Sequence, residues 1–349
     1  MKISYMLKRE DFYAINEQTL NTFFEPTNGA KTTLYIYPHL NAITTSTPSK
    51  EVRDYIYTEY SVSGSLIKKL LVWGYTRLCL NTFGLFAARK IAIPTSISSQ
   101  TLIYPCNRKF RIFDFAHNTV SVITKSGFPK NSIKNEIEFR TKSAPCEFIL
   151  PISDFSDDIY SERIIDGTPL ARIVDNRKEL EQQALKMWQT YSENSKQTVS
   201  ASEYAAILQQ KFDKYIKKIT NIKTSANIAK ANLLIKRLIS QLRNSDSDIE
   251  LIQSHGDLQS GNIWVENKTK QIFIIDWESV ELRSIWYDAA VLYDDIRKPH
   301  CFEAFSKIND LEHTVVVLEE IIYRMNELCE LPEDYGSDSF NLFIDKLEN

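Results

Sequence analysis

The feature that most constrains the fold is a pair of short apolar runs, residues 263–266 and 271–276, joined by the polar stretch Asn-Lys-Thr-Lys. β-Branched and aromatic residues on both sides of a tight polar turn are typical of a β-hairpin. A hairpin returns the chain to the edge from which it started, so Asp276 comes back beside Asp257 and Asn262, which precede the first run. The sequence therefore predicts three oxygen-bearing side chains at one edge of a hairpin.

The residues around Asp257 admit two interpretations. The segment Ser-His-Gly-Asp-Leu-Gln-Ser-Gly-Asn, residues 254–262, is rich in residue types that form turns. Phosphoryl transfer, however, needs a carboxylate that orients a hydroxyl group, and carboxylate and amide oxygens that bind Mg²⁺. Asn262 follows Asp257 by five residues and Asp276 follows a hairpin, which is the order of these residues in kinases. This arrangement favours a site over a simple turn.

The composition is that of an ordinary globular protein. The 349 residues leave room for two or three domains with a sizeable core. The net charge of −3 creates no field that would attract nucleic acid, so we expect no nucleic-acid partner. Five scattered cysteines without CxxC spacing, and an N-terminus without the apolar core of a signal peptide, predict a cytoplasmic location.

Upstream of the hairpin, the predicted secondary structure changes twice. Strands are predicted at 108–115 and 119–125, a short helix at 132–143, and two more strands at 146–155 and 158–167. This order predicts a small antiparallel sheet with one helix. Between residues 171 and 245, three stretches have apolar residues at helical spacing, and Ser200 with Glu203 forms a capping-box pattern before the second.

A mostly apolar stretch at residues 68–90 has basic residues at both ends. These residues are Lys68, Lys69, Arg89 and Lys90. Arg77 and two glycines interrupt the stretch, so it does not fit a helix that spans a membrane. Two interpretations remain: a buried or half-buried helix, or a helix on an anionic membrane surface with its basic residues toward the headgroups.

The sequence His-Gly-Asp-Leu-Gln-Ser-Gly-Asn, followed by Ile-Ile-Asp-Trp-Glu and then Trp-Tyr-Asp-Ala-Ala, resembles the aminoglycoside phosphotransferase and choline kinase-like family. The resemblance covers roughly residues 105–330 and is strongest at 254–290. It implies an α+β fold with two lobes like those of protein kinases, a small antiparallel-sheet N-lobe and a mainly helical C-lobe. We expect an extra N-terminal region in addition.

Three parts of the chain follow from this interpretation. Residues 1–100 are predicted to form an N-terminal accessory region, 101–168 the kinase-like N-lobe, and 169–349 the helical C-lobe with the catalytic loop. The Ser- and Thr-rich stretch at 93–100, which contains Pro94, is typical of a linker and sets the first boundary.

The resemblance implies a role for each residue of the motif. Asp257 matches the catalytic aspartate, and Asn262 and Asp276 match the Mg²⁺ ligands. His255 matches a structural histidine, so we expect it to hold the loop by backbone hydrogen bonds rather than to act as a general base.

Two further acidic residues follow the motif. Asp288 resembles a helix-borne aspartate that braces the catalytic loop, although a helix N-cap is an equal alternative. Glu278 lies beside the predicted metal site and is a candidate ligand for a second Mg²⁺.

The nucleotide-binding residues carry a weaker signal. Lys125, at the end of a predicted strand, is in the place of the lysine that holds the ATP phosphates, with Glu136 as its partner and Glu138 as the alternative. The turn between the first two strands has no glycine, so the backbone amides of residues 116–119 would have to contact the phosphates. Residues 160–167 occupy the place of the hinge that receives the adenine.

These features predict an ATP- and Mg²⁺-dependent enzyme that transfers a phosphoryl group to a hydroxyl of a small molecule or saccharide. The stretch at 68–90 favours an acceptor at a membrane, such as a cell-envelope sugar. An aminoglycoside acceptor would call for an acidic cleft, to which residues 154–158 and 293–297 contribute acidic side chains. The aromatic residues Trp277, Trp286, Tyr287 and Tyr293 suggest instead a box for a choline-type substrate, or simply a helix core. A non-catalytic nucleotide-binding scaffold is the alternative of another class.

Overall fold

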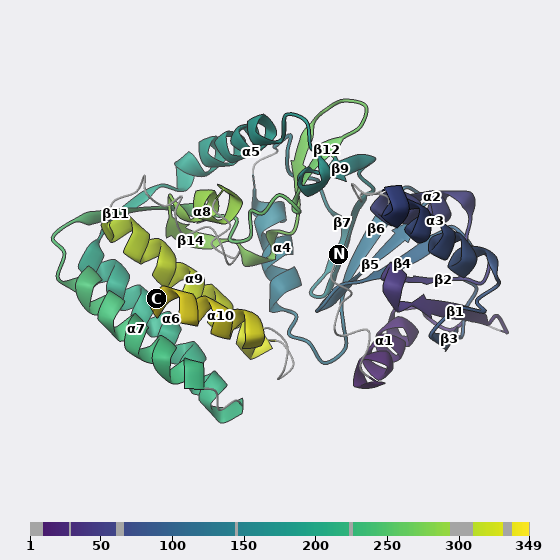
Figure 1. Cartoon of the computed structure of the whole chain (residues 1–349), viewed down its shortest axis with the longest axis horizontal. Coiled ribbons are helices and arrows are strands. Elements are labelled where there is room, and N and C mark those ends of the chain that lie inside the picture. The colour runs from purple at the N-terminus through teal and green to yellow at the C-terminus, as the bar shows by residue number, and fades with distance from the viewer. Residues whose placement is uncertain are drawn as a thin grey trace. The chain divides into compact units, whose positions relative to one another are not determined.

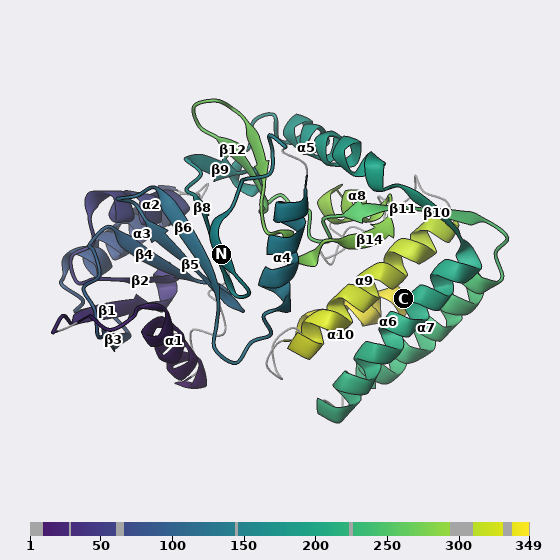
Figure 2. The same ribbon diagram turned by 180° about the vertical axis from the view of Figure 1, so that it is seen from behind.

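The computed structural model describes residues 10–27, 29–60, 66–143, 146–222, 226–293, 310–330 and 337–348. The chain divides into two compact units (Figures 1 and 2). Unit 1 comprises Met1–Ser143 and Leu150–Asp166, and unit 2 comprises Ala144–Ile149 and Gly167–Asn349. Among the described helices, none is both long enough and apolar enough to cross a membrane.

Unit 1 is built on an eight-stranded antiparallel sheet with the order β3-β1-β2-β4-β5-β6-β8-β7. Its strands are β1 (Thr32–Tyr37), β2 (Ala42–Thr44), β3 (Arg89–Ile93), β4 (Thr101–Pro105), β5 (Lys109–Asp114), β6 (Thr119–Thr124), β7 (Ser153–Ser156) and β8 (Ile159–Arg163). The predicted hairpin of β5 and β6 forms, with Lys109 opposite Thr124 and Asp114 opposite Thr119.

Helices cover both faces of this sheet. The helices of unit 1 are α1 (Glu10–Phe23), α2 (Lys50–Tyr60), α3 (Leu66–Asn81) and α4 (Asn131–Lys142), with the short η2 (Pro38–Leu40). Val120 and Val122 of β6 pack in one apolar cluster with α2, α3 and α4. Ile123, the next residue, packs in a second cluster with Leu20 of α1. Successive residues of a strand point to opposite faces, so β6 contributes to both clusters.

The N-terminal hundred residues are part of this same unit. Strands β1, β2 and β3 extend the sheet beyond β4, where Ile43 lies opposite Ile103. Residues 93–100, expected to be a linker between regions, are instead the loop that joins β3 to β4 within one sheet. The apolar residues Leu102 and Ile103 of β4 are fully buried. Strand β2, which pairs with β4, therefore belongs to the same core and not to a separate region.

The strand predicted at 146–155 is shorter than expected. Only Ser153–Ser156 pairs as β7, and residues 146–149 belong to unit 2, where Ile149 forms a bridge with Ile274. Pro151 lies between the two parts and has no amide hydrogen to donate to a sheet, which explains the interruption.

Unit 2 combines two small sheets with a bundle of helices. One sheet has the order β10-β11-β14 and the other β13-β12-β9. The strands are β9 (Gly167–Pro169), β10 (Gln197–Ser200), β11 (Asp248–Ser254), β12 (Ile263–Glu266), β13 (Ile272–Ile274) and β14 (Glu281–Ser284). The helices are α5 (Arg177–Ser192), α6 (Ala201–Ile222), α7 (Ala226–Arg243), α8 (Tyr287–Tyr293), α9 (Asp310–Glu330) and α10 (Ser337–Glu348), with η3 (Leu170–Arg172), η4 (Glu193–Ser195) and η5 (Trp277–Ser279).

The core of unit 2 lies among α6, α7, α9 and α10. Apolar residues of these helices form one cluster that also includes Leu251 of β11 and Tyr287 of α8. The predicted capping pattern is present at the start of α6, where the amide of Glu203 donates to Ser200 Oγ at 3.2 Å. This core fixes β11 and α8, the two elements between which the candidate site is built.

Candidate active site

The loop at 255–262 and the β12–β13 hairpin bring the predicted acidic and amide residues together. β11 ends at Ser254, and the hairpin pairs Ile263 with Ile274. One residue further along each strand, the amide of Ile275 donates to the carbonyl of Asn262 at 2.9 Å. This bond places the backbone just before Asp276, which follows β13, next to the end of the loop that carries Asp257.

Asp257 and Asn262 are joined directly. The side-chain nitrogen of Asn262 donates to the carbonyl oxygen of Asp257 at 2.9 Å and to its Oδ2 at 3.0 Å. Because both acceptors require a nitrogen donor, the orientation of the amide is settled by the hydrogen bonds. The Oδ1 atom of Asn262 is thus the atom available to a cation, and an amide oxygen is a ligand that Mg²⁺ accepts.

Asp276 has a left-handed backbone, with φ 72° and ψ 54°, immediately before η5. This conformation is uncommon for residues other than glycine, and Asp tolerates it better than most. Its side chain is half-buried, whereas the following Trp277 is fully buried and donates from Nε1 to the carbonyl of Ile274 at 3.0 Å. The buried tryptophan fixes the turn that presents the carboxylate.

His255 is fully buried and both of its ring nitrogens are engaged. Nδ1 accepts from the amide of Asp257 at 3.2 Å, so Nε2 carries the hydrogen and donates to the carbonyl of Ile275 at 3.1 Å. The ring also packs against Trp277, with centroids 4.6 Å apart. With both nitrogens bonded to the backbone, the ring connects the loop to the hairpin, which is the arrangement a scaffold role requires.

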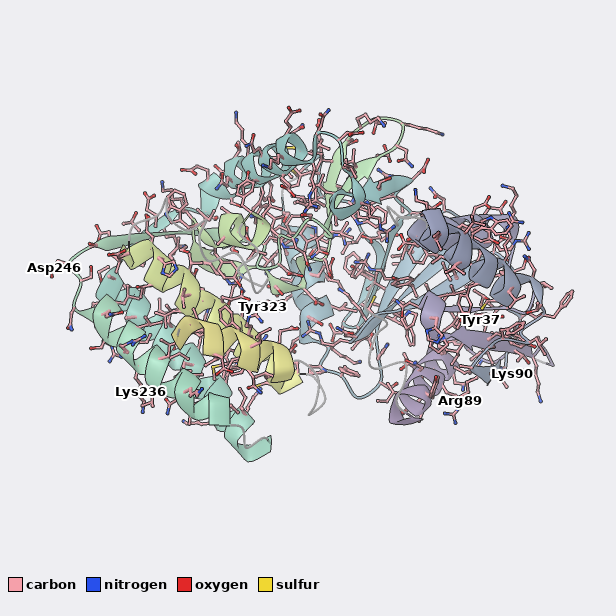
Figure 3. All side chains as sticks on the ribbon, viewed as in Figure 1. Tyr37, Arg89, Lys90, Lys236, Asp246 and Tyr323 are labelled. Carbon is pink, nitrogen blue, oxygen red and sulfur yellow. The ribbon has the colours of Figure 1, made fainter. Side chains whose placement is uncertain are left out.

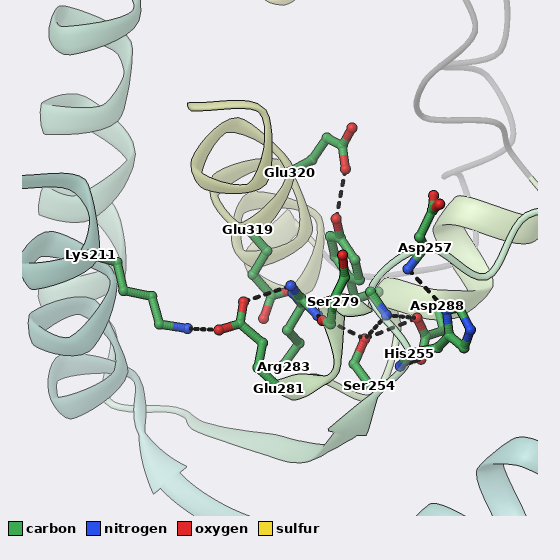
Figure 4. A network of polar contacts seen from close by, with 12 residues as sticks. Lys211, Ser254, His255, Asp257, Ser279, Glu281, Arg283, Asp288, Glu319 and Glu320 are labelled. Carbon is green, nitrogen blue, oxygen red and sulfur yellow. Dashed lines mark hydrogen bonds and ion pairs between the residues drawn. The ribbon is translucent and has the colours of Figure 1, made fainter. Parts of the chain in front are cut away.

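Asp288, in the first turn of α8, accepts four hydrogen bonds, and Figure 4 shows it beside Ser254 and His255. Its Oδ2 accepts from the amide of His255 at 2.8 Å and from the indole of Trp188 at 2.7 Å. Its Oδ1 accepts from the hydroxyl of Ser254 at 2.9 Å and from the amide of Gly256 at 3.0 Å. Of the two predicted interpretations, these contacts are those of a brace for the loop and not of a helix N-cap.

Gly256 is required at its position by both conformation and space. It has φ 81°, and a Cβ atom there would lie 2.4 Å from Arg283 Nη1 and from the carbonyl oxygen of Ser279. Arg283 donates to that carbonyl at 2.9 Å and forms an ion pair with Glu281 at 2.6 Å (Figure 4). Burial disfavours the charge on Arg283, but the adjacent Glu281 keeps the pKa of Arg283 above its ordinary value. The loop therefore rests against a charged, buried guanidinium.

Helix α5 contributes residues that the sequence did not single out. The hydroxyl of Ser260 donates to Glu181 Oε1 at 3.1 Å, and Arg177 donates to the same oxygen at 2.7 Å. Glu181 is buried, although charged residues of a surface helix usually face solvent. A signal was available, because Glu181 and Trp188 are seven residues apart and so lie on one helix face.

Glu278 lies in η5, two residues after Asp276, and is half-buried. No three His, Cys, Asp or Glu residues group as a metal site within the described residues. The proposed donors are instead the amide of Asn262 and the carboxylate of Asp276, both hard oxygen ligands that fit Mg²⁺. The role of Glu278 at a second Mg²⁺ stays a prediction.

The brace can be tested by Asp288→Asn. An amide nitrogen cannot accept, so two of the four buried donors would lose their acceptor, at about 1–3 kcal/mol each. We expect the free energy of unfolding of unit 2 to fall by about 2–5 kcal/mol in urea titrations. Asp213→Asn, at an exposed position of α6, is the matched control and should change it by less than about 0.5 kcal/mol. Equal stability of the two variants would contradict the brace.

In unit 1, the predicted pair of Lys125 and Glu136 is not brought together. Lys125 is two residues after Ile123, so its side chain points to the same face of the sheet, the face that packs against α1. Its ammonium group lies over the ring of Phe110, 4.7 Å from the centroid, and donates to the carbonyl of Cys106 at 2.5 Å. Burial lowers the pKa of Lys125 to about 7, so its charge is only partial near neutral pH. Glu136 belongs to α4, on the opposite face.

Glu136 has other cationic neighbours. Its Oε1 accepts from Arg140 Nη1 at 3.1 Å, and its Oε2 lies 3.9 Å from the ammonium of Lys109. Arg140 is further tied to Glu162 at 2.7 Å and to the carbonyl of Leu150. All four charged side chains are buried. Lys109 points to the α4 face because it shares the alternation of Phe113, which packs in the cluster with α4.

The glycine-free turn between β5 and β6 is closed by its own aspartate. Asp114 Oδ1 accepts from the amides of Ala116 at 3.0 Å and His117 at 3.3 Å. These are two of the amides expected to contact phosphate. They are occupied in this structure, because an aspartate at the first position of a turn bonds to the amides that follow it.

Comparison with known proteins bears on the fold. No protein-family model matches the chain, and no curated protein matches it. The apo form of a thermostable mutant of aminoglycoside phosphotransferase APH(4)-Ia is similar, with 12% identity and a TM-score of 0.51 over 72% of this chain and 91% of that chain. A mutant of the same enzyme in a ternary complex with AMP-PNP and hygromycin B has 12% identity and a TM-score of 0.50, over 72% and 90%.

An ethanolamine kinase from Plasmodium vivax aligns over 86% of this chain and 93% of its own, with 14% identity and a TM-score of 0.45. At these identities, the likeness to the aminoglycoside phosphotransferase concerns the fold. The α+β fold with two kinase-like lobes, expected from the sequence, is confirmed. The chain therefore has the fold of an aminoglycoside phosphotransferase.

Proposed function

We propose that this protein is an ATP- and Mg²⁺-dependent phosphotransferase that moves the γ-phosphoryl group to a hydroxyl of a small molecule or saccharide. One observation carries the proposal: Asp257 and Asn262 are hydrogen-bonded to each other, the residue before Asp276 is bonded to Asn262, and the buried carboxylate of Asp288 holds the backbone of their loop. A loop that served only as a turn would not need a buried carboxylate with four donors to fix it.

Each residue of this group has a distinct task. Asp257 would orient the acceptor hydroxyl and take up its proton, while Asn262 and Asp276 would hold Mg²⁺. When bound, Mg²⁺ neutralises the charge on the phosphate oxygens. Asn262 also donates to Asp257. The same side chain would therefore bind Mg²⁺ and hold the catalytic carboxylate beside the metal. Catalysis would come chiefly from positioning and charge.

For the nucleotide, we propose Lys109 in place of Lys125. Lys109 lies on the face of the sheet that carries Glu136, and the 3.9 Å contact between them is looser than that between Glu136 and Arg140. An ammonium on this face is oriented by a helix glutamate, as the phosphate-binding lysine of kinases is. Arg140 is less suited, because Glu136, Glu162 and the Leu150 carbonyl already share its guanidinium.

Three observations bear on the class of acceptor. The similar enzyme in complex with AMP-PNP and hygromycin B supports a nucleotide and a small-molecule acceptor, and an aminoglycoside is one alternative. The exposed Asp154 and Asp157 fit a cationic substrate, whereas Asp158 is half-buried and paired with Lys130 at 2.6 Å. Residues 294–297 lie outside the described residues. A choline-type box is disfavoured, because Trp277 and Tyr287 are fully buried in the core. A saccharide acceptor remains our first choice.

The test is transfer of labelled phosphate. We expect ATP with Mg²⁺ to raise the melting temperature of the protein, and labelled ATP to phosphorylate at least one member of a panel of sugars, aminoglycosides, choline and cell-envelope extract. Stabilisation by ATP without transfer to any acceptor or to water would favour the non-catalytic scaffold. Absence of both effects would contradict the proposal.

Two lysine variants locate the phosphate contact in the same assay. Lys109→Met should weaken ATP binding at least about tenfold, because a charged contact to phosphate contributes about 1.5–3 kcal/mol. Lys125→Met is the matched control, and we expect its ATP affinity to stay within about threefold of the wild type. The reverse result would restore Lys125 and contradict the assignment to Lys109.

A further inference from the structure

Helix α3 has apolar residues on two opposite faces. One face packs in the core of unit 1 through Cys79 and Leu80. The other face carries apolar residues at helical spacing that are between 47% and 72% exposed: Ile67, Leu70, Leu71 and Leu78. A surface helix of a globular protein normally places polar residues on its outer face. The outer face of α3 therefore calls for a partner.

The turn after α3 extends this apolar surface. Phe83, Leu85 and Phe86 are 72%, 77% and 46% exposed. Gly84 has φ 83°, and a Cβ atom there would lie 2.0 Å from the ring of Tyr35, so the backbone of the turn is pressed against the sheet. Phe83 has φ 52°, a left-handed conformation that is unfavourable for a bulky residue. The turn thus holds its apolar side chains outward at a cost in backbone strain.

We define the 67–86 surface as Ile67, Leu70, Leu71, Trp73, Leu78, Phe83, Leu85 and Phe86. With Tyr75, these make nine of the sixteen large apolar side chains exposed in the described part of the chain. Single exposed apolar residues are normal, but a contiguous group marks an interaction site. The clustering within twenty residues therefore indicates one binding surface.

The charged residues of the segment that carries this surface are all basic. Between residues 61 and 91 the sequence has five basic and no acidic side chains, in a chain with a net charge of −3. Arg77 is exposed and stacks on Trp73, 4.5 Å from the ring centroid. On β3, Lys90 is exposed and lies over the ring of Tyr35, which packs against the cluster that contains α3. Arg89, its neighbour in Figure 3, lies over Tyr13 of α1, on the other face of the sheet. Two copies that met through this segment would bring like charges together, so its charge favours an anionic partner.

We infer that the 67–86 surface rests on a lipid bilayer with anionic headgroups. Helix α3 lies in the plane of the interface, with Leu70, Leu71 and Leu78 among the acyl chains and Arg77 at the phosphates. Exposed leucine and aromatic side chains beside basic residues are the composition of helices that bind in this way. The inference does not depend on the proposed phosphotransferase activity.

The experiment uses the full chain and sedimentation with vesicles. We expect binding to phosphatidylcholine vesicles that contain phosphatidylserine, and at least about tenfold weaker binding to phosphatidylcholine alone, since basic residues are attracted to anionic lipid. Raising NaCl from about 50 to about 500 mM should release the protein, because salt screens this attraction. No binding to anionic vesicles at low salt would overturn the inference.

Substitutions locate the contact. Leu71→Glu combined with Leu78→Glu should reduce binding at least about tenfold, because two carboxylates on the outer face oppose both apolar burial and the anionic lipid. Leu233→Glu, at an exposed position of α7 in unit 2, is the matched control and should bind as the wild type does. Equal loss in both variants would overturn the inference. So would a wild-type dimer in sedimentation without lipid that the double variant converts to monomer, since the occupant would then be a second copy.

Discussion

Asp257→Asn is expected to retain ATP and Mg²⁺ binding within a few-fold of the wild type while phosphoryl transfer falls about 10²–10⁴-fold. The side chain keeps its size. In the wild type, Asn262 donates to Asp257 Oδ2 at 3.0 Å, and the remaining oxygen of the variant can still accept this bond. The charge that draws the hydroxyl proton is removed. Neither proposed Mg²⁺ ligand is changed, so binding and chemistry should separate.

The measurement is therefore a pair on one variant, namely ATP affinity by titration and transfer rate with labelled ATP. Asp248→Asn, at an exposed position near the start of β11, is a matched control that should keep both values. Full transfer in Asp257→Asn would mean that the loop is only a turn, since Asn forms turns as well as Asp does. Loss of ATP binding together with transfer would place Asp257 in the binding of the nucleotide instead.

The sequence was most informative where residues that act together are close along the chain. Asp257, Asn262 and Asp276 lie within twenty residues, and a hairpin with a four-residue turn leaves few ways to arrange its ends. The bond from Ile275 to Asn262 follows from that pairing. For this reason, the pairing that brings the backbone before Asp276 to Asn262 could be predicted without knowledge of the rest of the fold.

The residues that hold the loop could not be found in this way. Asp288 bonds to Trp188, which lies one hundred residues earlier, and Glu181 bonds to Ser260 from the same distant helix. In the sequence, Glu181 is one of many charged residues in a helical stretch. Only the packing of α5 shows that it is buried, and a buried carboxylate must find donors.

The separation of Lys125 from Glu136 has a different origin. The hairpin of β5 and β6 was predicted in the correct place, but the side chains of a strand alternate between faces, so a shift of one residue reverses the face. The sequence does not show which face α4 covers. That depends on Ile133 and Ile137 packing with Val120 and Val122. Lys109, on the neighbouring strand, lies on the face of Glu136 and carried no signal of its own in the sequence.

Residues 1–100 show how an accessory region can be misjudged. A stretch rich in Ser and Thr is typical of a linker, yet residues 93–100 connect two strands of one sheet. The reason is that β2 pairs with β4 through a short contact at Ile43 and Ile103. Pairing between strands that are far apart in sequence depends on which apolar side chains become buried together. A local sequence pattern does not contain this information.

The second large effect is expected for Asp276→Ala, which should abolish the Mg²⁺-dependent part of the stabilisation by ATP. Stabilisation by a ligand depends on its affinity, and the proposed Mg²⁺ site would keep only the amide of Asn262 as a protein ligand. The measurement is the melting temperature with ATP, with and without Mg²⁺. Ordinary destabilisation must be separated from this effect, because Asp276 has φ 72° and alanine is unfavourable in that conformation by about 1–2 kcal/mol.

The chain offers a matched control for that cost. Asp154, an exposed residue of unit 1 with φ 45°, also has a left-handed backbone, so Asp154→Ala carries a similar strain without changing a proposed Mg²⁺ ligand. Both variants should melt earlier than the wild type without ligand, but only Asp276→Ala should lose the response to Mg²⁺. Asp276→Asn tolerates the left-handed backbone and keeps one oxygen, so its response should be weakened and not absent. A wild-type response to Mg²⁺ in Asp276→Ala would remove this residue from the metal site, and with it the reason to regard the hairpin as more than a support for the loop.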